Sequence, residues 1–173
     1  PTNTETDFIF LPDELTTIRE NSFSGNEHLQ MVVIPLHVNN ISNSAFSGCC
    51  NLKNVYYLGT NKPTIAVNAF ESTQVNKIKV KNGYSYTFNG LTTTPMSKTS
   101  SGSVYYFIDS DTGLMVFYGE GYEVYQDYDK YSWYQQGSKI KHVIFEEGIT
   151  KIDQYSFYDN DNKYPNLKNV KIG

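Results

Sequence analysis

The sequence predicts a solenoid, a fold in which similar coils of the chain stack on one another and share one core. Four apolar positions, separated by close to five, six and three residues, recur along the chain. The first three sets are Ile18, Phe23, Leu29 and Val32; Ile41, Phe46, Leu52 and Val55; and Ile65, Phe70, Val75 and Ile78. Successive sets lie 23 or 24 residues apart, and a fixed period of this size indicates stacked repeats.

The pattern returns near the end of the chain as Ile152, Phe157, Leu167 and Val170, with four extra residues between Phe157 and Leu167.

Each repeat also contains a short segment close to L-x-x-V-x-I. These segments are Leu29, Val32, Ile34; Leu52, Val55, Tyr57; Val75, Ile78, Val80; Ile140, Val143, Phe145; and Leu167, Val170, Ile172. Their alternating end predicts a short strand with one buried face.

The remainder of each repeat reads V-x-x-I-x-x-x-A/S-F, as in Val38, Ile41, Ala45 and Phe46. This stretch is too short for a stable free-standing helix. We therefore expect an irregular or single-turn arm whose Ile and Phe side chains reach into the stack. One repeat cannot bury its own apolar face, so neighbouring repeats must share a core.

A short side chain follows each recurrent Phe by three residues: Asn26, Cys49, Thr73 and Asn160. At a tight turn, such a side chain satisfies backbone groups that the turn leaves unpaired. We expect Cys49 to be a structural residue of this kind and Cys50 to point outward. A reactive thiol is the alternative, although nothing nearby in the sequence supplies a base.

Composition excludes several other classes of protein. Charged residues make up 18% of the 173 residues and the formal net charge is -4, which disfavours a nucleic-acid binder that acts through bulk charge. The sequence has no apolar run long enough to span a membrane, and Pro1 begins no signal-peptide pattern. The only two cysteines are adjacent, so we expect neither a disulfide framework nor a thiolate zinc cluster.

The second half of the chain differs from the first. Segments 104–109 (VYYFID) and 114–118 (LMVFY) flank S-D-T-G, a strong hairpin signal. Segment 119–137 is rich in tyrosine and loop-like. We predict a repeat unit with its closing segment over residues 1–95, a flexible linker over 96–103, and a hairpin cap with the start of a second repeat block over 104–173.

Three segments resemble BspA-like leucine-rich repeats: LTTIRENSFSGNEHLQMVVIP, VNNISNSAFSGCCNLKNVYY and EEGITKIDQYSFYDNDNKYPNLKNVKI. The family unit reads roughly I-P-x-x-V-x-x-I-x-x-x-A-F-x-x-C-x-x-L-x-x-V, and the resemblance covers about 8–82 and 140–173. The chain departs from it at Arg19, Asn43 and Asp153, where Gly is common, and at Ser22 and Ser156, where Ala is common. The resemblance implies a leucine-rich-repeat solenoid of short parallel strands and irregular arms, interrupted by a β-hairpin cap. An aromatic residue near Trp133 would cover the first repeat of the second block.

Outward side chains of the strands predict a basic binding face in a chain that is acidic overall. If five strands align, six of the 14 basic residues share this face. The candidate binding residues are Lys53, Tyr56, Lys77, Lys79, Lys141, His142, Lys168 and Lys171. Local positive charge would recognise an acidic or glycan-bearing partner, whereas the alternative is an ordinary solvated face.

Tyrosines at intervals of three residues predict a second candidate surface: Tyr122, Tyr125, Tyr128, Tyr131 and Tyr134. Exposed aromatic rings stack on sugars or anchor protein partners. The alternative is that some of these rings, and above all Trp133, seal the cap.

Signals for catalysis, metals and cofactors are weak. D-S-D-T-G at 109–113 is shorter than a calcium loop and no bidentate Glu follows it, so we expect a plain turn. Asp159 and Asp161 are similarly uninformative, and we assign no metal and no cofactor. The three histidines are isolated in sequence, and the chain lacks a phosphate-binding glycine loop and a nucleophile elbow. We therefore expect no enzymatic activity.

The family resemblance implies an adhesion module that is extracellular or at the cell surface. Its partner would be a host or matrix protein or another cell-surface protein, with glycans as a further class, and neither nucleic acid nor membrane insertion is expected. Two alternatives remain: a structural spacer, and a carbohydrate-binding module that uses the tyrosine-rich cap. Asn40-Ile41-Ser42 is the sole glycosylation sequon.

Overall fold

The alternating V-x-I segments form parallel strands in a computed structural model of the chain. The structure describes residues 7–96, 99–101, 104–119, 121–122, 133–152, 157 and 162–173. Contacts divide the chain into unit 1, Pro1–Met96, and unit 2, Ser97–Gly173.

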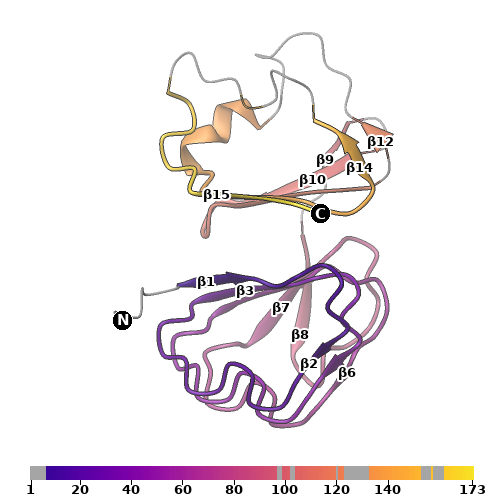
Figure 1. Ribbon diagram of the computed structural model, residues 1–173, viewed down its shortest axis with the longest axis vertical. Coiled ribbons are helices and arrows are strands. Elements are labelled where there is room, and N and C mark those ends of the chain that lie inside the picture. Colours follow the sequence, from indigo (N-terminus) through magenta and orange to yellow (C-terminus); the bar gives the residue numbers. More distant parts are fainter. Residues whose placement is uncertain are drawn as a thin grey trace. The chain divides into compact units, whose positions relative to one another are not determined.

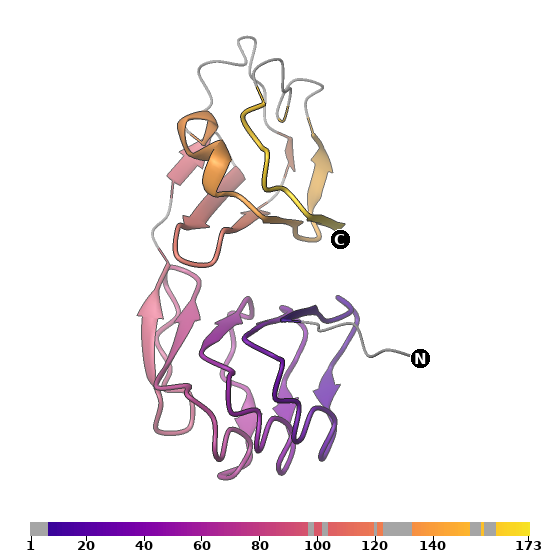
Figure 2. The same cartoon turned by 90° about the vertical axis from the view of Figure 1, so that its left-hand side faces the viewer.

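The main sheet of unit 1 has the strand order β1-β3-β5-β7-β8, and all of its pairs are parallel. Its strands are β1 (Phe8–Phe10), β3 (Met31–Ile34), β5 (Asn54–Tyr57), β7 (Lys77–Val80) and β8 (Thr92–Pro95). Figures 1 and 2 show successive coils side by side, each contributing one strand. The register places Val32 beside Val55 and Val55 beside Ile78, as the period of the sequence predicts.

The arms also form strands, which was not predicted. β2 (Thr17–Ile18), β4 (Asn40–Ile41) and β6 (Thr64–Ile65) pair in parallel as a narrow second sheet. The arms were expected to be irregular or to form a single turn because the stretch is too short for a stable free-standing helix; in the structure, two residues of each arm pair. Their backbone groups pair only because stacking brings equivalent residues of neighbouring coils together.

The three recurrent phenylalanines of unit 1 form a column inside the stack. The ring centroids of Phe23 and Phe46 are 5.1 Å apart, and those of Phe46 and Phe70 are 5.2 Å apart. Both pairs are nearly parallel, with interplanar angles of 7° and 4°. Phe46 has no exposed surface. The column confirms the central prediction that successive coils share an apolar core.

The short side chains that follow each phenylalanine form hydrogen bonds with backbone groups of the turns. The Cys49 thiol donates to the Phe23 carbonyl at 3.0 Å, and the Thr73 hydroxyl donates to the Phe70 carbonyl at 2.8 Å. Asn26 Oδ1 accepts from the backbone N–H of Leu29 at 3.2 Å. Cys49 is buried and Cys50 is exposed, so the structural interpretation of Cys49 is confirmed. Asn160 lies outside the described residues.

Unit 1 closes at its C-terminal end with an aromatic cluster and β8. Phe88 is fully buried, and its ring lies 5.3 Å from Tyr57 and 6.4 Å from Phe70. β8 pairs with β7 and was not predicted, because its T-T-T-P sequence lacks apolar alternation. The partner strand supplies the backbone pairing that the sequence of β8 does not suggest.

Unit 2 contains a mixed sheet in the order β15-β13-β11-β10-β9. The predicted hairpin is present as an antiparallel pair, and its second strand pairs in parallel with the first repeat strand. The strands are β9 (Thr99–Ser101), β10 (Val104–Asp109), β11 (Leu114–Gly119), β13 (His142–Phe145) and β15 (Asn169–Ile172). β12 (Gly121–Tyr122) and β14 (Ile149–Lys151) form a separate pair.

Two local differences from the sequence prediction occur here. The segment expected to be a linker contains β9, which pairs antiparallel with β10; its polar composition concealed the strand. The segment expected to be loop-like runs into a 3₁₀ helix, η2 (Tyr134–Lys139). Trp133, at the start of η2, is 1% exposed, and its ring lies 5.0 Å from Tyr106 and 5.1 Å from Phe117 in edge-on contacts.

Replacing Phe46 by Ala should lower the free energy of unfolding by about 3–5 kcal/mol, because it removes the central ring of the column and leaves a cavity. Urea denaturation followed by circular dichroism measures the change. Val67 is 94% exposed, so Val67→Ala is the matched control and should change stability by less than about 0.5 kcal/mol. Equal effects from the two variants would contradict a shared core around Phe46.

In the native protein one thiol should react with an aromatic disulfide reagent at pH 8, and two should react in denaturant. Burial raises the pKa of the Cys49 thiol, which lowers its thiolate fraction as well as its access to reagent. Cys50→Ala should then leave no rapidly reacting thiol in the folded chain. Rapid labelling of that variant would show that Cys49 is not held in the core.

Stability should fall as pH rises from about 10 to about 12 partly because of Tyr57. Its hydroxyl lies 2.9 Å from the Asn61 carbonyl and 3.1 Å from the Val38 carbonyl, and burial, then the nearby Tyr84, raises its pKa to about 12. The unfolded chain loses this proton near pH 10, so the contribution of Tyr57 is complete below pH 10 and is lost above it. Tyr57→Phe should be less stable at neutral pH but should lose less stability across this window in urea titrations. An unchanged slope would exclude Tyr57 as a contributor.

Candidate binding surface on the repeat units

The main sheet of unit 1 has one face in the core and one face directed away from it. Val32, Val55 and Ile78 belong to the core cluster, and because side chains alternate along a strand, their neighbours lie on the opposite face. The register aligns those neighbours in two columns. The first contains Phe8, Met31, Asn54, Lys77 and Thr92, and the second contains Phe10, Val33, Tyr56, Lys79 and Thr94.

Composition changes steadily across this face. It is aromatic and aliphatic at β1 and β3, mixed at β5, basic at β7 and hydroxyl-bearing at β8. Phe8 and Phe10 form an edge-on pair with centroids 4.6 Å apart. Met31, Val33 and Tyr56 are buried, with at most 5% of their surface exposed, whereas Lys77 is exposed, so the accessible charges lie on the basic side of this face.

Lys77 and Lys79 lie on the basic side of this face, and Lys53 and Lys81 lie next to it, one residue before β5 and one residue after β7; we name these four residues the lysine strip. The strand segments 29–36, 52–59, 74–82 and 91–96 contain no Asp or Glu, although acidic residues outnumber basic ones 18 to 14 in the whole chain. Lys53 and Lys77 are exposed. Lys81 was not among the predicted binding residues, although the alternating sequence K-I-K-V-K at 77–81 places it in phase with Lys77 and Lys79.

Lys79 is held against its own sheet. Its ammonium lies 5.0 Å from the centroid of the Tyr56 ring, and it donates to Tyr56 Oη at 3.3 Å and to Asn54 Oδ1 at 3.4 Å. A cation above an aromatic ring is attracted to its negative face. Tyr56 is fully buried, so it positions the Lys79 charge and has no exposed surface of its own to offer a partner.

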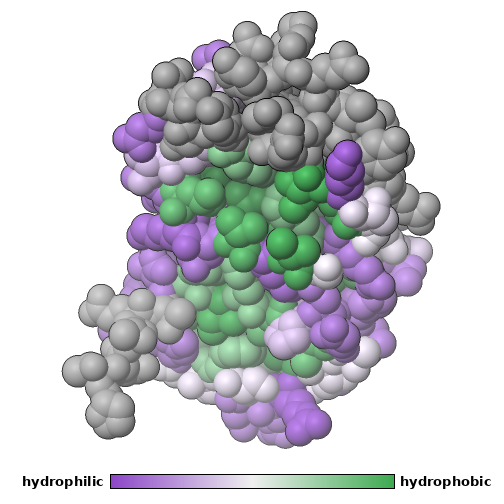
Figure 3. Space-filling model, turned by 45° about the horizontal axis from the view of Figure 1, so that its top comes forward, coloured by the Kyte–Doolittle hydropathy of each residue, from purple (hydrophilic) through white to green (hydrophobic). Residues whose placement is uncertain are grey.

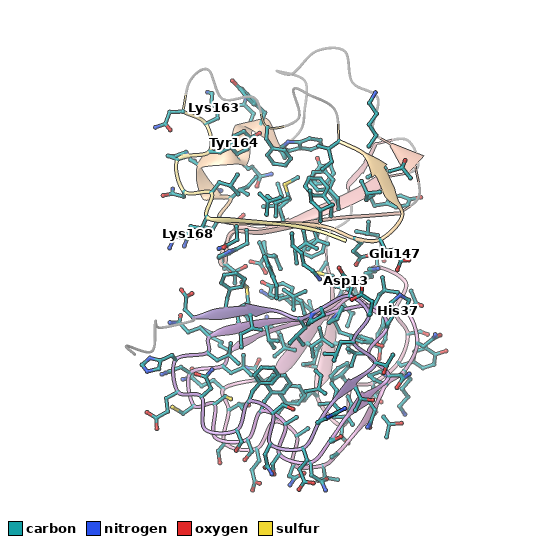
Figure 4. All side chains as sticks on the ribbon, in the orientation of Figure 1. Asp13, His37, Glu147, Lys163, Tyr164 and Lys168 are labelled. Atoms are coloured by element: carbon teal, nitrogen blue, oxygen red, sulfur yellow. The ribbon has the colours of Figure 1, made fainter. Side chains whose placement is uncertain are left out.

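The remaining candidate residues lie in unit 2. Lys141 and Lys168 are exposed and adjacent in neighbouring coils, where the Lys168 N–H donates to the Lys141 carbonyl at 2.8 Å. Lys171 pairs in register with Ile144, and His142 Nδ1 lies 3.2 Å from Asn169 Nδ2. Figure 4 shows Lys163 and Lys168 on the segment that leads into β15.

The predicted columns do not run through five strands. β7 pairs with β5 and β8, whereas β13 pairs with β11 and β15. The lysines of the two units consequently belong to two separate sheets, because the closing strand β8 and the hairpin intervene. Sequence period alone did not reveal this interruption of the stack.

The predicted tyrosine patch is only partly described. The side chain of Tyr122 and the whole of Tyr125, Tyr128 and Tyr131 lie outside the described residues. Tyr134 is half-buried and packs against the core of unit 2, and the Lys163 ammonium lies 5.1 Å from its ring centroid. Trp133 is a core residue of the same unit. These two rings support the interpretation that cap aromatics seal the core.

An open hollow of about 600 Å³, which was not predicted from the sequence, lies on the first coil of unit 1. Its apolar lining includes Leu11, Leu15, Ile18 and Phe23, with Arg19 at its polar side. The lower half of Figure 3 shows hydrophobic residues flanked by hydrophilic ones on this side of the unit. The hollow exposes the edge of the stacked core.

The D-S-D-T-G segment forms the turn between β10 and β11. The Asp109 carboxylate accepts from the Asp111 N–H at 3.0 Å, and the Asp109 carbonyl accepts from the Gly113 N–H at 2.8 Å. This carboxylate therefore stabilises its own turn. Among the described residues, no three His, Cys, Asp or Glu side chains lie together in an arrangement suited to a metal ion. No helix in the described part of the chain has the length and apolar character needed to cross a membrane.

Comparison with known proteins gave one match. The family model described as "BspA type Leucine rich repeat region" matches six copies, over residues 2–98 and 125–172. Neither a curated protein nor a solved structure matches the chain. The matched residues include the strands, arms and phenylalanine column of unit 1 and the repeat coil of unit 2.

Proposed function

Because the chain belongs to the BspA-type leucine-rich repeat family, we propose that it is a non-enzymatic adhesion module that binds a macromolecular partner through its sheet surfaces. Leucine-rich repeats are protein-interaction scaffolds. Stacked coils of this kind create extended surfaces whose side chains vary without disturbing the core. The partner that we propose is a host or matrix protein, or another cell-surface protein, and the location is extracellular or at the cell surface.

The lysine strip of unit 1 is the observation that carries this proposal. Its charges lie on contiguous strands whose flanks contain no Asp or Glu, in a chain with a net charge of -4. Local positive potential on such a surface attracts acidic partners and raises the association rate even when the whole protein is acidic. Met31 and Val33 on the β3 side of the same face are buried, so the exposed lysines carry the proposed contact.

Adhesion through the tyrosine-rich cap receives less support. Of the aromatic residues proposed for that surface, Tyr134 packs against the core of unit 2, and its neighbour Trp133 is buried there. A spacer role predicts no coherent charge pattern, whereas the lysine strip is coherent across two neighbouring strands and their flanks.

The chain should bind at least one member of a panel of immobilised matrix proteins in surface plasmon resonance. The triple variant Lys53→Glu, Lys77→Glu and Lys79→Glu should weaken that binding by roughly tenfold or more, because it replaces attraction with repulsion at the interface. Circular dichroism of the triple variant verifies that it remains folded. Binding that is unaffected by the triple variant would remove the strip from the proposed function, and no binding across the panel would favour a spacer.

A further inference from the structure

We propose that the lysine strip is a binding site for a linear sulfated polysaccharide that lies along β7. This inference rests on the proposed function in that it uses the same surface, and it names the chemistry of the partner. Four features of unit 1 support it: the spacing of the charges, the anchoring of Lys79, the neutral hydroxyl border and the lack of local acidic residues.

The charges are arranged along a line. Lys77 and Lys79 lie on the same face of β7, and Lys81 follows in the same phase. Strand geometry places alternate residues about 6.6 Å apart, so the backbone positions of the three lysines extend over about 13 Å. A linear polymer with repeated anionic groups contacts several of these charges at once, whereas a small anion contacts one or two.

Lys53 widens the line into a strip. It precedes β5, the strand that pairs with β7, and its backbone N–H donates to the Gln30 carbonyl at 3.1 Å. Neighbouring strands lie about 4.8 Å apart. Lys53 is exposed one residue before β5 begins, so it adds a positive charge beside the line of β7.

Lys79 is partly pre-organised for an anion. Its contacts with the Tyr56 ring, Tyr56 Oη and Asn54 Oδ1 restrict the ammonium to the surface of the sheet. Ordering of the side chain before binding reduces the conformational entropy lost on association. A sulfate oxygen accepts a charge-assisted hydrogen bond from such a group.

The border of the strip suits sugar hydroxyl groups. In register, Lys77 lies beside Thr92 and Lys79 beside Thr94 on β8, and both threonines are exposed. Threonine hydroxyls donate and accept hydrogen bonds, as sugar hydroxyls do. An acidic protein partner would gain more from apolar anchors, but Met31 and Val33 on β3 are buried.

The test measures binding of the full chain to immobilised heparin, used as the sulfated probe. Lys53→Glu with Lys77→Glu should weaken binding by at least roughly tenfold. Lys62→Glu with Lys139→Glu is the matched control, because all four lysines are exposed and both double variants change net charge equally. The control should bind within about threefold of the unaltered chain. Equal losses in the two variants would show that bulk charge alone governs binding and would overturn the proposal.

Comparison of different probes distinguishes a sulfated polysaccharide from a carboxylate-bearing polysaccharide and from a protein partner. Heparin binding should weaken steeply as salt rises, while hyaluronan, which carries carboxylates and no sulfates, should bind more weakly. Hyaluronan binding as strong as heparin binding, or no heparin binding at all, would overturn the assignment of a sulfated partner. Undiminished binding to matrix proteins stripped of their glycans, together with no heparin binding, would overturn this inference and leave the proposed function intact.

Discussion

Stacking of one coil on the next is the constraint on which the rest of the structure depends. A single coil of 23 or 24 residues cannot bury its own apolar face, so it needs a neighbouring coil to pack against. The rings of Phe23, Phe46 and Phe70 meet face to face at 5.1 and 5.2 Å. Offset or parallel aromatic contacts add to the free energy gained from burying the rings. Once this column forms, the strands and arms of neighbouring coils come within hydrogen-bond reach of each other.

The same constraint separates residues that stabilise the fold from residues that are available for recognition. Ile78 and Val80 are buried in the core, so Lys77 and Lys79 must project from the opposite face of β7. A change at either lysine leaves the core packing of that strand in place. The stacked coils therefore form a rigid support on which surface charges can change without disturbing the core. For this reason the lysine strip can serve as a site of recognition.

The ends of the coils use aromatic residues in a different way. Phe88 and Tyr84 close unit 1 around Tyr57, and Trp133 packs edge-on against Phe117 and Tyr106 in unit 2. A large ring covers much of the end of a stacked core at a small entropic cost. This role explains why an abundance of aromatic residues is not by itself a sign of a sugar-binding surface here.

The sequence by itself determined the period, the core positions and the family, because the spacing of Ile, Phe, Leu and Val residues repeats the geometry of one coil. It also determined the hairpin, where a turn sequence separates two apolar segments, and the structural role of Cys49. Only the tertiary structure decided which strands are neighbours. β2, β4, β6, β8 and β9 are too short or too polar to be recognised in isolation, and their pairing depends on partners far away in the sequence. For the same reason the candidate lysines divide between two sheets, and the contact of Lys79 with Tyr56 could be seen only after β5 and β7 had been placed side by side.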